Sequence, residues 1–218
     1  MTEIVIRNQE FLDTLNSISD EFFSYEDYDD PKYLLHAGDI DNGEFYCSRE
    51  HLMEQFQRQD EHIGFPQSLM GQPITNMVKK DPDKWAGYMQ RVKFDFAAEI
   101  GAHTSALLNF YPAGGFVGWH TNWNASGYNI LITYNTEENG GYFRYLDPVT
   151  KEIVTMVDPK GWSCKVGHFG DRSDPNKIVY HCCGNTAKRL TLGYVVPHLE
   201  IWRSMIEDIS GEDASHFS

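Results

Sequence analysis

Cationic residues are scarce in this sequence of 218 residues. Lys and Arg number 18 against 32 Asp and Glu, which leaves a formal net charge of −14. Non-specific affinity for nucleic acid rests on contacts of Lys and Arg with phosphate, so this balance argues against a nucleic-acid partner. The same charge disfavours binding to anionic membranes and favours solubility. Only a local basic pocket would reverse these inferences.

Long apolar runs are also missing. No segment approaches the roughly 18 consecutive apolar residues that span a bilayer, and the N-terminus lacks the apolar stretch of a signal peptide. The four cysteines form neither a CxxC pair nor a zinc-ribbon spacing. Adjacent cysteines such as Cys182 and Cys183 rarely bridge each other, because the geometry strains the backbone. These absences predict a soluble protein of the reducing cytoplasm with free thiols and no membrane partner.

Neither the GxSxG turn of hydrolases nor the P-loop of nucleotide-binding enzymes occurs in the sequence. No internal repeat and no low-complexity linker divides it. We therefore expect one domain over residues 1–210, followed by a flexible tail, "GEDASHFS", over residues 211–218.

The first hundred residues predict helices and loops. Apolar residues recur at helical spacing over about 8–23, at Phe11, Leu15, Ile18 and Phe22. Ser48 is a candidate N-cap for a second helix. A third is predicted over 82–100, with Pro82 in its first turn and Gly101 as its stop.

After Gly101 the hydrophobic period changes from 3.6 to 2, and short β-rich runs alternate with turn sequences. The predicted strands cover residues 103–112, 116–120, 128–134, 141–146, 151–157, 162–167, 177–182 and 189–196. Eight short strands without intervening helices predict a double-sheet jelly roll. The expected fold is thus α+β: a double-stranded β-helix core over 101–197, with an N-terminal helical layer (1–100) packed on one sheet.

Alternation along the strands brings polar residues to one face. Asn109 and Tyr111 point the same way, as do Arg189 and Thr191, while the residues alternating with the latter pair are apolar. The predicted strand 177–182 also contains His181. Polar side chains that face a sandwich interior need a ligand or a metal to satisfy them.

The spacing of three of these features resembles that of the Fe(II)/2-oxoglutarate dioxygenase superfamily. His120-Thr121-Asn122 is followed by His181 after 61 residues and by Arg189 after 8 more. The resemblance covers about residues 101–197. It implies that iron is held by His120, position 122 and His181, as in a 2-His-1-carboxylate facial triad. It further implies a set of residues that bind 2-oxoglutarate, namely Arg189, Thr191, Tyr111 and Asn109.

This resemblance implies iron(II), 2-oxoglutarate and dioxygen as the reagents. The activity would be hydroxylation or oxidative demethylation of a small molecule or of an amino-acid or peptide side chain. The upstream Asn109-x-Tyr111 is similar to AlkB-type members, whereas the short interval from His181 to Arg189 is closer to prolyl-hydroxylase-like members, so the subfamily stays open. The alternative is a catalytically degenerate jelly-roll protein that retains a 2-oxoglutarate or anion pocket.

Position 122 departs from the family pattern, because it is an asparagine where a carboxylate is expected. Three interpretations stay open: the amide oxygen of Asn122 ligates iron, a carboxylate such as Asp171 or Asp147 replaces it, or the site has lost its metal.

Other residues allow weaker hypotheses. His168 is a rival distal histidine, with Arg172 four residues on, but it precedes a turn. Five aromatic residues could form a substrate wall or simply belong to the core: Trp119, Trp123, Tyr142, Phe143 and Tyr145. The acidic run from Glu26 to Asp30 is either a solvated loop or a site for a cation or peptide.

Overall fold

The computed structural model describes residues 1–58, 64–122, 126–171 and 173–217. Within them, antiparallel pairing connects the strands in the order β1-β9-β6-β11-β4-β3-β5-β10-β7-β8, with β2 on β3. The strands are β1 (Thr2–Ile4), β2 (Leu35–Ala37), β3 (Leu69–Pro73), β4 (Thr104–Tyr111), β5 (Phe116–His120), β6 (Gly127–Asn135), β7 (Gly141–Leu146), β8 (Ile153–Asp158), β9 (Gly161–Phe169), β10 (His181–Asn185) and β11 (Arg189–Val196). This nearly closed antiparallel sheet is compatible with the predicted jelly roll.

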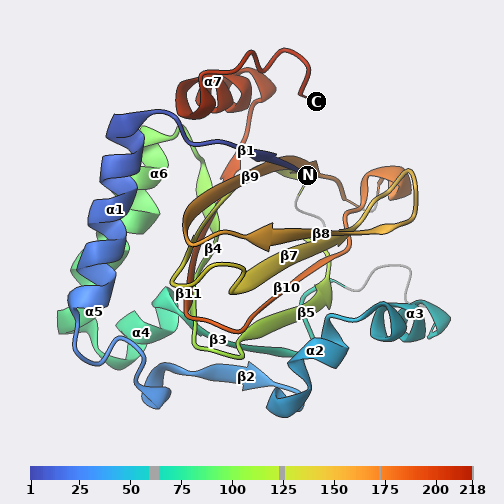
Figure 1. The fold of residues 1–218 in the computed structure, drawn as a ribbon, viewed down its shortest axis with the longest axis horizontal. Helices are drawn as coiled ribbons and strands as arrows, with labels where there is room; N and C mark the ends of the chain where they lie inside the picture. Colours follow the sequence, from blue (N-terminus) through green and yellow to red (C-terminus); the bar gives the residue numbers. More distant parts are fainter. Residues whose placement is uncertain (59–63, 123–125, 172, 218) are drawn as a thin grey trace.

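Strand β3 joins the two halves of the sheet. It pairs with β4 on one side and with β5 on the other (Figure 1). One half contains β1, β9, β6, β11 and β4, and the other contains β5, β10, β7 and β8. The prediction of helices and loops for residues 1–100 therefore missed β1, β2 and β3. They are three to five residues long, too short to show a period of two.

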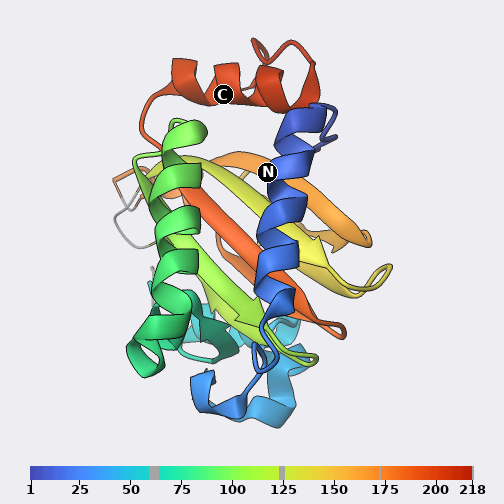
Figure 2. The same ribbon diagram turned by 90° about the vertical axis from the view of Figure 1, so that its left-hand side faces the viewer.

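Helices cover the outer face of the first half. The helices are α1 (Gln9–Ser24), α2 (Gly43–Tyr46), α3 (Arg49–Gln57), α4 (Ile74–Lys80), α5 (Pro82–Gln90), α6 (Phe96–Glu99) and α7 (Leu199–Ser210). Figure 2 shows α1 beside the α5–α6 segment over the sheet, with α7 across one end. The predicted apolar stripe of α1 is buried because it packs on the sheet, and Asn8 Oδ1 caps the helix by accepting from the Phe11 amide (3.1 Å).

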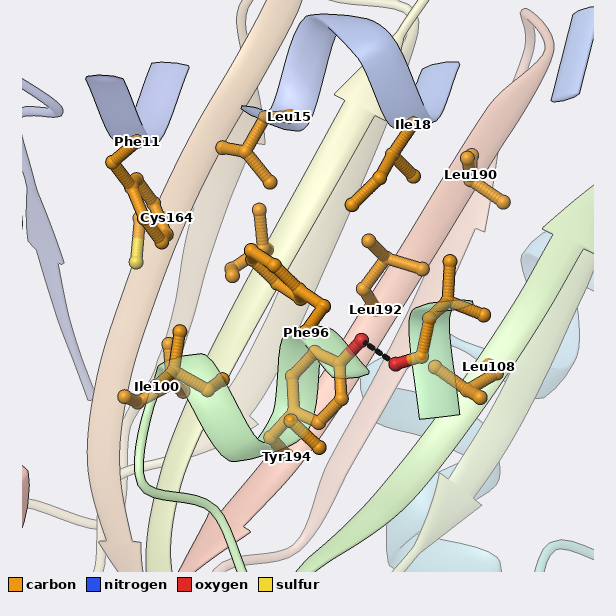
Figure 3. Close-up of a cluster of buried hydrophobic side chains, with 14 of the residues drawn as sticks. Phe11, Leu15, Ile18, Phe96, Ile100, Leu108, Cys164, Leu190, Leu192 and Tyr194 are labelled. Atoms are coloured by element: carbon orange, nitrogen blue, oxygen red, sulfur yellow. Dashed lines mark hydrogen bonds between the residues drawn. The ribbon is translucent and has the colours of Figure 1, made fainter. Parts of the chain in front are cut away.

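The core between these helices and the sheet is apolar on both sides. Figure 3 shows Leu15 and Ile18 of α1 and Phe96 of α6 against Leu190 and Leu192 of β11. The apolar residues of β11 therefore face the helices, and the residues that alternate with them face the other way.

The third predicted helix is interrupted. Instead of one helix over 82–100, a π-helical turn (η3, Arg91–Asp95) separates α5 from α6. The hydroxyl of Tyr194 on β11 donates a hydrogen bond to the Val92 carbonyl oxygen there (2.6 Å, Figure 3). A widened turn allows a helix carbonyl to accept from outside the helix.

The strand predicted over 177–182 was placed too early. A 3₁₀ turn (η4, Pro175–Lys177) precedes it, and β10 begins only at His181 and continues through Cys183 to Asn185. Gly184 and Asn185 read as a turn in the sequence, yet Gly184 lies in the strand, where an added Cβ would meet the Tyr142 hydroxyl at 2.7 Å. Close approach of Tyr142, not a turn, explains this glycine.

Residues 211–217, for which the sequence predicts a flexible tail, pack against the rest of the structure. Ala214 and Phe217 are buried in the main core, and Arg203 donates from Nε and Nη2 to the Phe217 carbonyl (2.9 and 2.7 Å). The preceding helix α7 buries Trp202, Ile206 and Ile209 on one face. None of the helices in the described residues is long and apolar enough to cross a membrane.

Candidate active site

A cavity of about 410 Å³ lies on the inner side of the sheet. Its wall includes all seven residues that the sequence nominated: Asn109, Tyr111, His120, Asn122, His181, Arg189 and Thr191. They come from β4, β5, the segment after β5, β10 and β11. The closure of the sheet thus brings together residues separated by up to 82 positions, the distance in sequence from Asn109 to Thr191.

His120 and His181 lie opposite each other in the β5–β10 pair, and their ring centroids are 4.1 Å apart. The Nδ1 of each ring contacts the backbone carbonyl oxygen two residues earlier, Gly118 for His120 and Val179 for His181, both at 2.9 Å. A carbonyl only accepts, so each Nδ1 carries the proton and each Nε2 keeps a free lone pair. A hydrogen bond of this kind orients a metal-binding imidazole.

Both rings are neutral at pH 7. Burial lowers the pKa of His120 to about 4. Burial, and then repulsion from His120, lowers the pKa of His181 well below its ordinary value. Two neutral imidazoles with free Nε2 atoms in one cavity can both coordinate a divalent metal without first losing a proton.

The side chain at the expected third metal position is neutral. Asn122 is half-buried in the cavity wall. Among the described residues, no group of three or more His, Cys, Asp or Glu could hold a metal, which contradicts the interpretation that Asp171 or Asp147 completes the triad. Asp147 Oδ1 accepts from the amides of Val149 and Thr150 (both 2.8 Å), and Asp171 Oδ1 accepts from the Ser173 amide (2.8 Å).

The rival histidine lies elsewhere. His168 packs at a tilt against Tyr128 (ring centroids 4.8 Å) and lines a second cavity, not the one that contains His120. Arg172, its possible partner, is outside the described residues. The preference for His181 as the partner of His120 agrees with this placement.

Arg189 lies in the same cavity wall and is buried, with 1% of its side chain exposed. Its Nε donates to Asp158 Oδ2 (3.0 Å), and Asp158 Oδ1 accepts from Lys165 Nζ (2.5 Å). Within the described part of the chain, Nη1 and Nη2 of Arg189 have no hydrogen-bond partner. A buried guanidinium with two free donors calls for an anion, and two parallel donors suit a carboxylate.

Burial and charge oppose each other in this cluster. Burial alone would raise the pKa of Asp158, but Arg189 and Lys165 outweigh it, so the pKa lies below its ordinary value. Burial likewise acts to lower the pKa of Arg189, and Asp158 reverses this, so the pKa lies above its ordinary value. Asp158 and Arg189 are therefore both charged at pH 7.

Further buried polar atoms without a partner in the described residues surround Arg189 in two rows. The register across β4, β11 and β6 aligns Tyr111, Arg189 and Asn135 in one row, and Asn109, Thr191 and Thr133 in the next. In this set the unpartnered atoms are Tyr111 Oη, Asn135 Nδ2, Asn109 Oδ1, Thr191 Oγ1 and Thr133 Oγ1. Six neighbouring residues with unsatisfied groups indicate a polar ligand site. The sequence analysis did not select Thr133 and Asn135. Pairing the predicted strand 128–134 with the predicted strand 189–196 would have placed both residues in these two rows.

The predicted aromatic wall is only partly present. Phe143 lines the cavity, and its ring centroid lies 5.6 Å from that of His181. Trp119 instead donates from Nε1 to the Ser48 carbonyl (2.7 Å), and Tyr142 packs under Arg144 (4.1 Å). Tyr145 bonds the Met1 carbonyl (3.2 Å), and Trp123 is outside the described residues. Phe169, which the sequence analysis did not select, lies 4.7 Å from His181 between ring centroids.

Two other expectations are resolved. The acidic run is paired with cations: Asp27 with Lys32 (3.3 Å) and with Lys84, and Asp29 with Lys188 (2.7 Å), which argues against a cation site there. The four cysteines are free and buried, as expected: Cys47, Cys164, Cys182 and Cys183.

Comparison with known proteins gives no family assignment. No protein-family profile and no curated protein matches the chain. Among solved structures it is similar to OsALKBH1 (14% identity, TM-score 0.31, 52% of this chain and 64% of that one). It is also similar to a Pseudomonas putida prolyl-4-hydroxylase (12% identity, TM-score 0.35, 84% of this chain and 99% of that one). A third similar structure is the collagen prolyl hydroxylase vCPH of Paramecium Bursaria Chlorella virus-1, in complex with 2OG (12% identity, TM-score 0.32, 78% of this chain and 98% of that one). The chain thus spans about two thirds of OsALKBH1. Likenesses this weak decide nothing about function, which rests on the residues of the cavity.

Proposed function

We propose that this protein is an iron(II)- and 2-oxoglutarate-dependent oxygenase that hydroxylates or oxidatively demethylates a small molecule or an amino-acid side chain. One observation carries the proposal. Two imidazoles whose Nδ1 atoms carry the proton line the same cavity as a buried guanidinium, which has two donors without a partner among the described residues. The two imidazoles suit a divalent metal, and the guanidinium suits a carboxylate. A 2-oxo dicarboxylate is a ligand that uses both.

The donor set fits iron(II) at two positions and weakly at the third. His120 and His181 would hold the metal, with the amide oxygen of Asn122 as a neutral third donor. When bound, iron(II) supplies the activation of dioxygen and the oxidation of the substrate. With three neutral donors the site keeps the full charge of the metal, so an anionic co-substrate is favoured beside it.

The chain's own residues bind and orient the co-substrate. Arg189 would hold the distal carboxylate through Nη1 and Nη2, and the hydroxyls of Thr191 and Tyr111 would donate to the same end. Asn109, which lines the cavity in the neighbouring row, would keep this end of the ligand fixed. Phe143 and Phe169 beside His181 would exclude water from the metal.

The mouth of the cavity favours an uncharged, apolar substrate. Leu35 (47% exposed) and Phe65 (76% exposed) belong to its wall and remain open to solvent. Arg189 is the only Asp, Glu, Lys or Arg among the described wall residues, and it lies in the buried carboxylate site. Because the described wall residues offer no other cation for phosphate, they support a small molecule or an apolar side chain over a nucleic acid.

The test is turnover of 2-oxoglutarate. The purified protein with iron(II), ascorbate and 2-oxoglutarate is expected to release succinate, and His181→Ala should abolish this release. His168→Ala removes a histidine outside the cavity and should leave it unchanged. Equal rates with and without iron, or in His181→Ala, would refute the proposal.

A second candidate function is favoured by Asn122, because no acidic ligand joins the histidine pair among the described residues. The protein would then be a non-catalytic jelly-roll binding protein that retains the anion pocket at Arg189. Tight binding of 2-oxoglutarate by metal-free protein, together with no succinate under any metal condition, would support this function instead.

A further inference from the structure

Behind the wall of the cavity, three buried charged side chains carry unequal charge. Asp158 is the single anion, and it accepts from two cations, Lys165 on β9 and Arg189 on β11. Lys165 and Asp158 are completely buried and Arg189 is 1% exposed. Because two cations share one anion out of reach of water and salt, the cluster has one uncompensated positive charge.

The uncompensated charge is directed into the cavity. Lys165 Nζ is occupied by Asp158 and by Ser163 Oγ (3.1 Å), and neither Lys165 nor Asp158 is among the described residues of the cavity wall. Only Arg189 reaches the wall, with Nη1 and Nη2 free of any partner in the described chain. Lys165 thus neutralises Asp158, and the charge of Arg189 is left for a ligand.

The packing around Asp158 fixes the direction of the guanidinium. Asp158 anchors Nε, which is the donor nearest the backbone, so the two terminal nitrogens point onward. Gly141 leaves room for this contact: an added Cβ would lie 3.0 Å from Asp158 Oδ2 and 3.3 Å from Arg189 Cδ. A guanidinium held in this way presents a rigid pair of donors.

We propose that Lys165 and Asp158 are positioning residues of the co-substrate site, which orient Arg189 and leave the buried cluster short of one negative charge that the distal carboxylate of a 2-oxo dicarboxylate supplies. This inference rests on the proposed function. Without Lys165, the Asp158–Arg189 pair would be neutral and would have no electrostatic need of an anion. With it, the site selects a carboxylate over a neutral group of the same size.

The experiment compares four forms of the metal-free full chain by calorimetric titration with 2-oxoglutarate in EDTA. The summed formal charge at positions 165, 158 and 189 is +1 in wild type, 0 in Lys165→Met, +2 in Asp158→Asn and +1 again in the double variant. Affinity in Lys165→Met should fall at least about tenfold, as expected for a buried unit charge several ångströms away. The double variant should return to within about threefold of wild type.

A purely structural role gives the opposite pattern. If Lys165 and Asp158 only support the fold, each single substitution should weaken the binding of 2-oxoglutarate and the two effects should add. The double variant should then bind no better than Lys165→Met. That result would overturn the inference. Should Asp158→Asn fail to fold because it buries two cations, Lys165→Met and the double variant still decide the question. Wild type itself should prefer 2-oxoglutarate to 2-oxoglutaramate, whose distal end is neutral, and equal affinities would also overturn the inference.

Two further variants separate this inference from the proposed function. Lys188→Met removes the neighbouring surface cation, which pairs with Asp29 and is 39% exposed, and should leave 2-oxoglutarate affinity unchanged. Arg189→Met should abolish binding. If metal-free wild type fails to bind, the inference of a cluster that needs an anion fails, whereas if Arg189→Met binds as tightly as wild type, the proposed function fails. If Arg189→Met abolishes binding and Lys165→Met does not weaken it, only the inference about Lys165 and Asp158 fails.

Discussion

His120 and His181 are direct cross-strand partners in the β5–β10 pair, and each ring is oriented by the carbonyl oxygen two residues before it. The same local hydrogen bond orients both imidazoles on two adjacent strands, and both rings line one cavity. The register shifts immediately after this pair, between His181 and Cys183. A register shift beside a side chain can re-aim it, and here the pairing resumes with Cys183 opposite Val117.

Restoring a carboxylate at position 122 should strengthen metal binding. Asn122→Asp adds an anionic donor beside two neutral imidazoles, and we expect iron(II) affinity to rise at least about tenfold. Competition with a chromophoric chelator under anaerobic conditions measures the change. Asn176→Asp, on an exposed turn, adds the same charge away from the cavity and serves as the control. An unchanged affinity would place Asn122 outside the coordination sphere.

Stability should fall as the pH drops below about 6.5, in part because of His51. Burial lowers the pKa of this ring, which packs against Phe45 and Tyr46. Below about pH 6.5 the unfolded chain binds a proton that the folded ring resists, so the free energy of unfolding decreases as pH falls toward the folded pKa.

Replacing His51 isolates its share of this effect. Urea unfolding between pH 7.5 and 5 should show a weaker pH dependence in His51→Gln than in wild type. His36→Gln removes an exposed histidine and should keep the wild-type slope. A slope that is equal in His51→Gln and wild type would exclude His51 as a source of the acid sensitivity.

The lack of space beside the charged cluster leaves no room for a side chain at Gly141. In Gly141→Ala the new methyl would lie 2.7 Å from Asn135 Nδ2 and 3.0 Å from Asp158 Oδ2, both of them buried. We expect a loss of about 1–3 kcal/mol in the free energy of unfolding. Gly87→Ala in α5 meets nothing within 4 Å and should stabilise the protein by up to about 1 kcal/mol. Equal effects of the two alanines on urea unfolding would contradict this explanation.

The sequence was sufficient to predict the helices and strands whose apolar residues recur at a clear period. The stripe of α1 and the alternation along β4 and β11 predicted both the burial of Leu190 and Leu192 and the inward position of Arg189 and Thr191. These positions depend only on local geometry, because one face of each element is apolar and the other is not.

Features that depend on distant contacts were not predictable. The start of β10 at His181 is set by its pairing with β5 and β7, and the glycine at 184 looked like a turn. The π turn at Arg91–Asp95 coincides with a hydroxyl from β11. Asp158 follows the predicted strand 151–157 and Lys165 lies within the predicted strand 162–167, and only the folded sheet brings them to Arg189.

The π turn provides a test of how helix and sheet are coupled. Tyr194→Phe removes the donor to the Val92 carbonyl oxygen (2.6 Å) and keeps the ring in place. A buried carbonyl that loses its partner costs about 1–2 kcal/mol, which chemical unfolding monitored by circular dichroism would measure. No change in stability would show that the carbonyl finds another donor, for example by closing into a regular α-helical turn.

The packed C-terminal segment should contribute measurably to stability. Phe217 is 8% exposed and contacts Trp202 at 6.0 Å between ring centroids, and its carbonyl holds Arg203. Phe217→Ala should cost about 3 kcal/mol through lost burial and the resulting cavity. His216→Ala, at an exposed position next to it, should cost less than about 0.5 kcal/mol. If Phe217→Ala unfolds at the same urea concentration as wild type, the segment does not pack on α7 in solution, and the sequence-based expectation of a flexible tail would be correct after all.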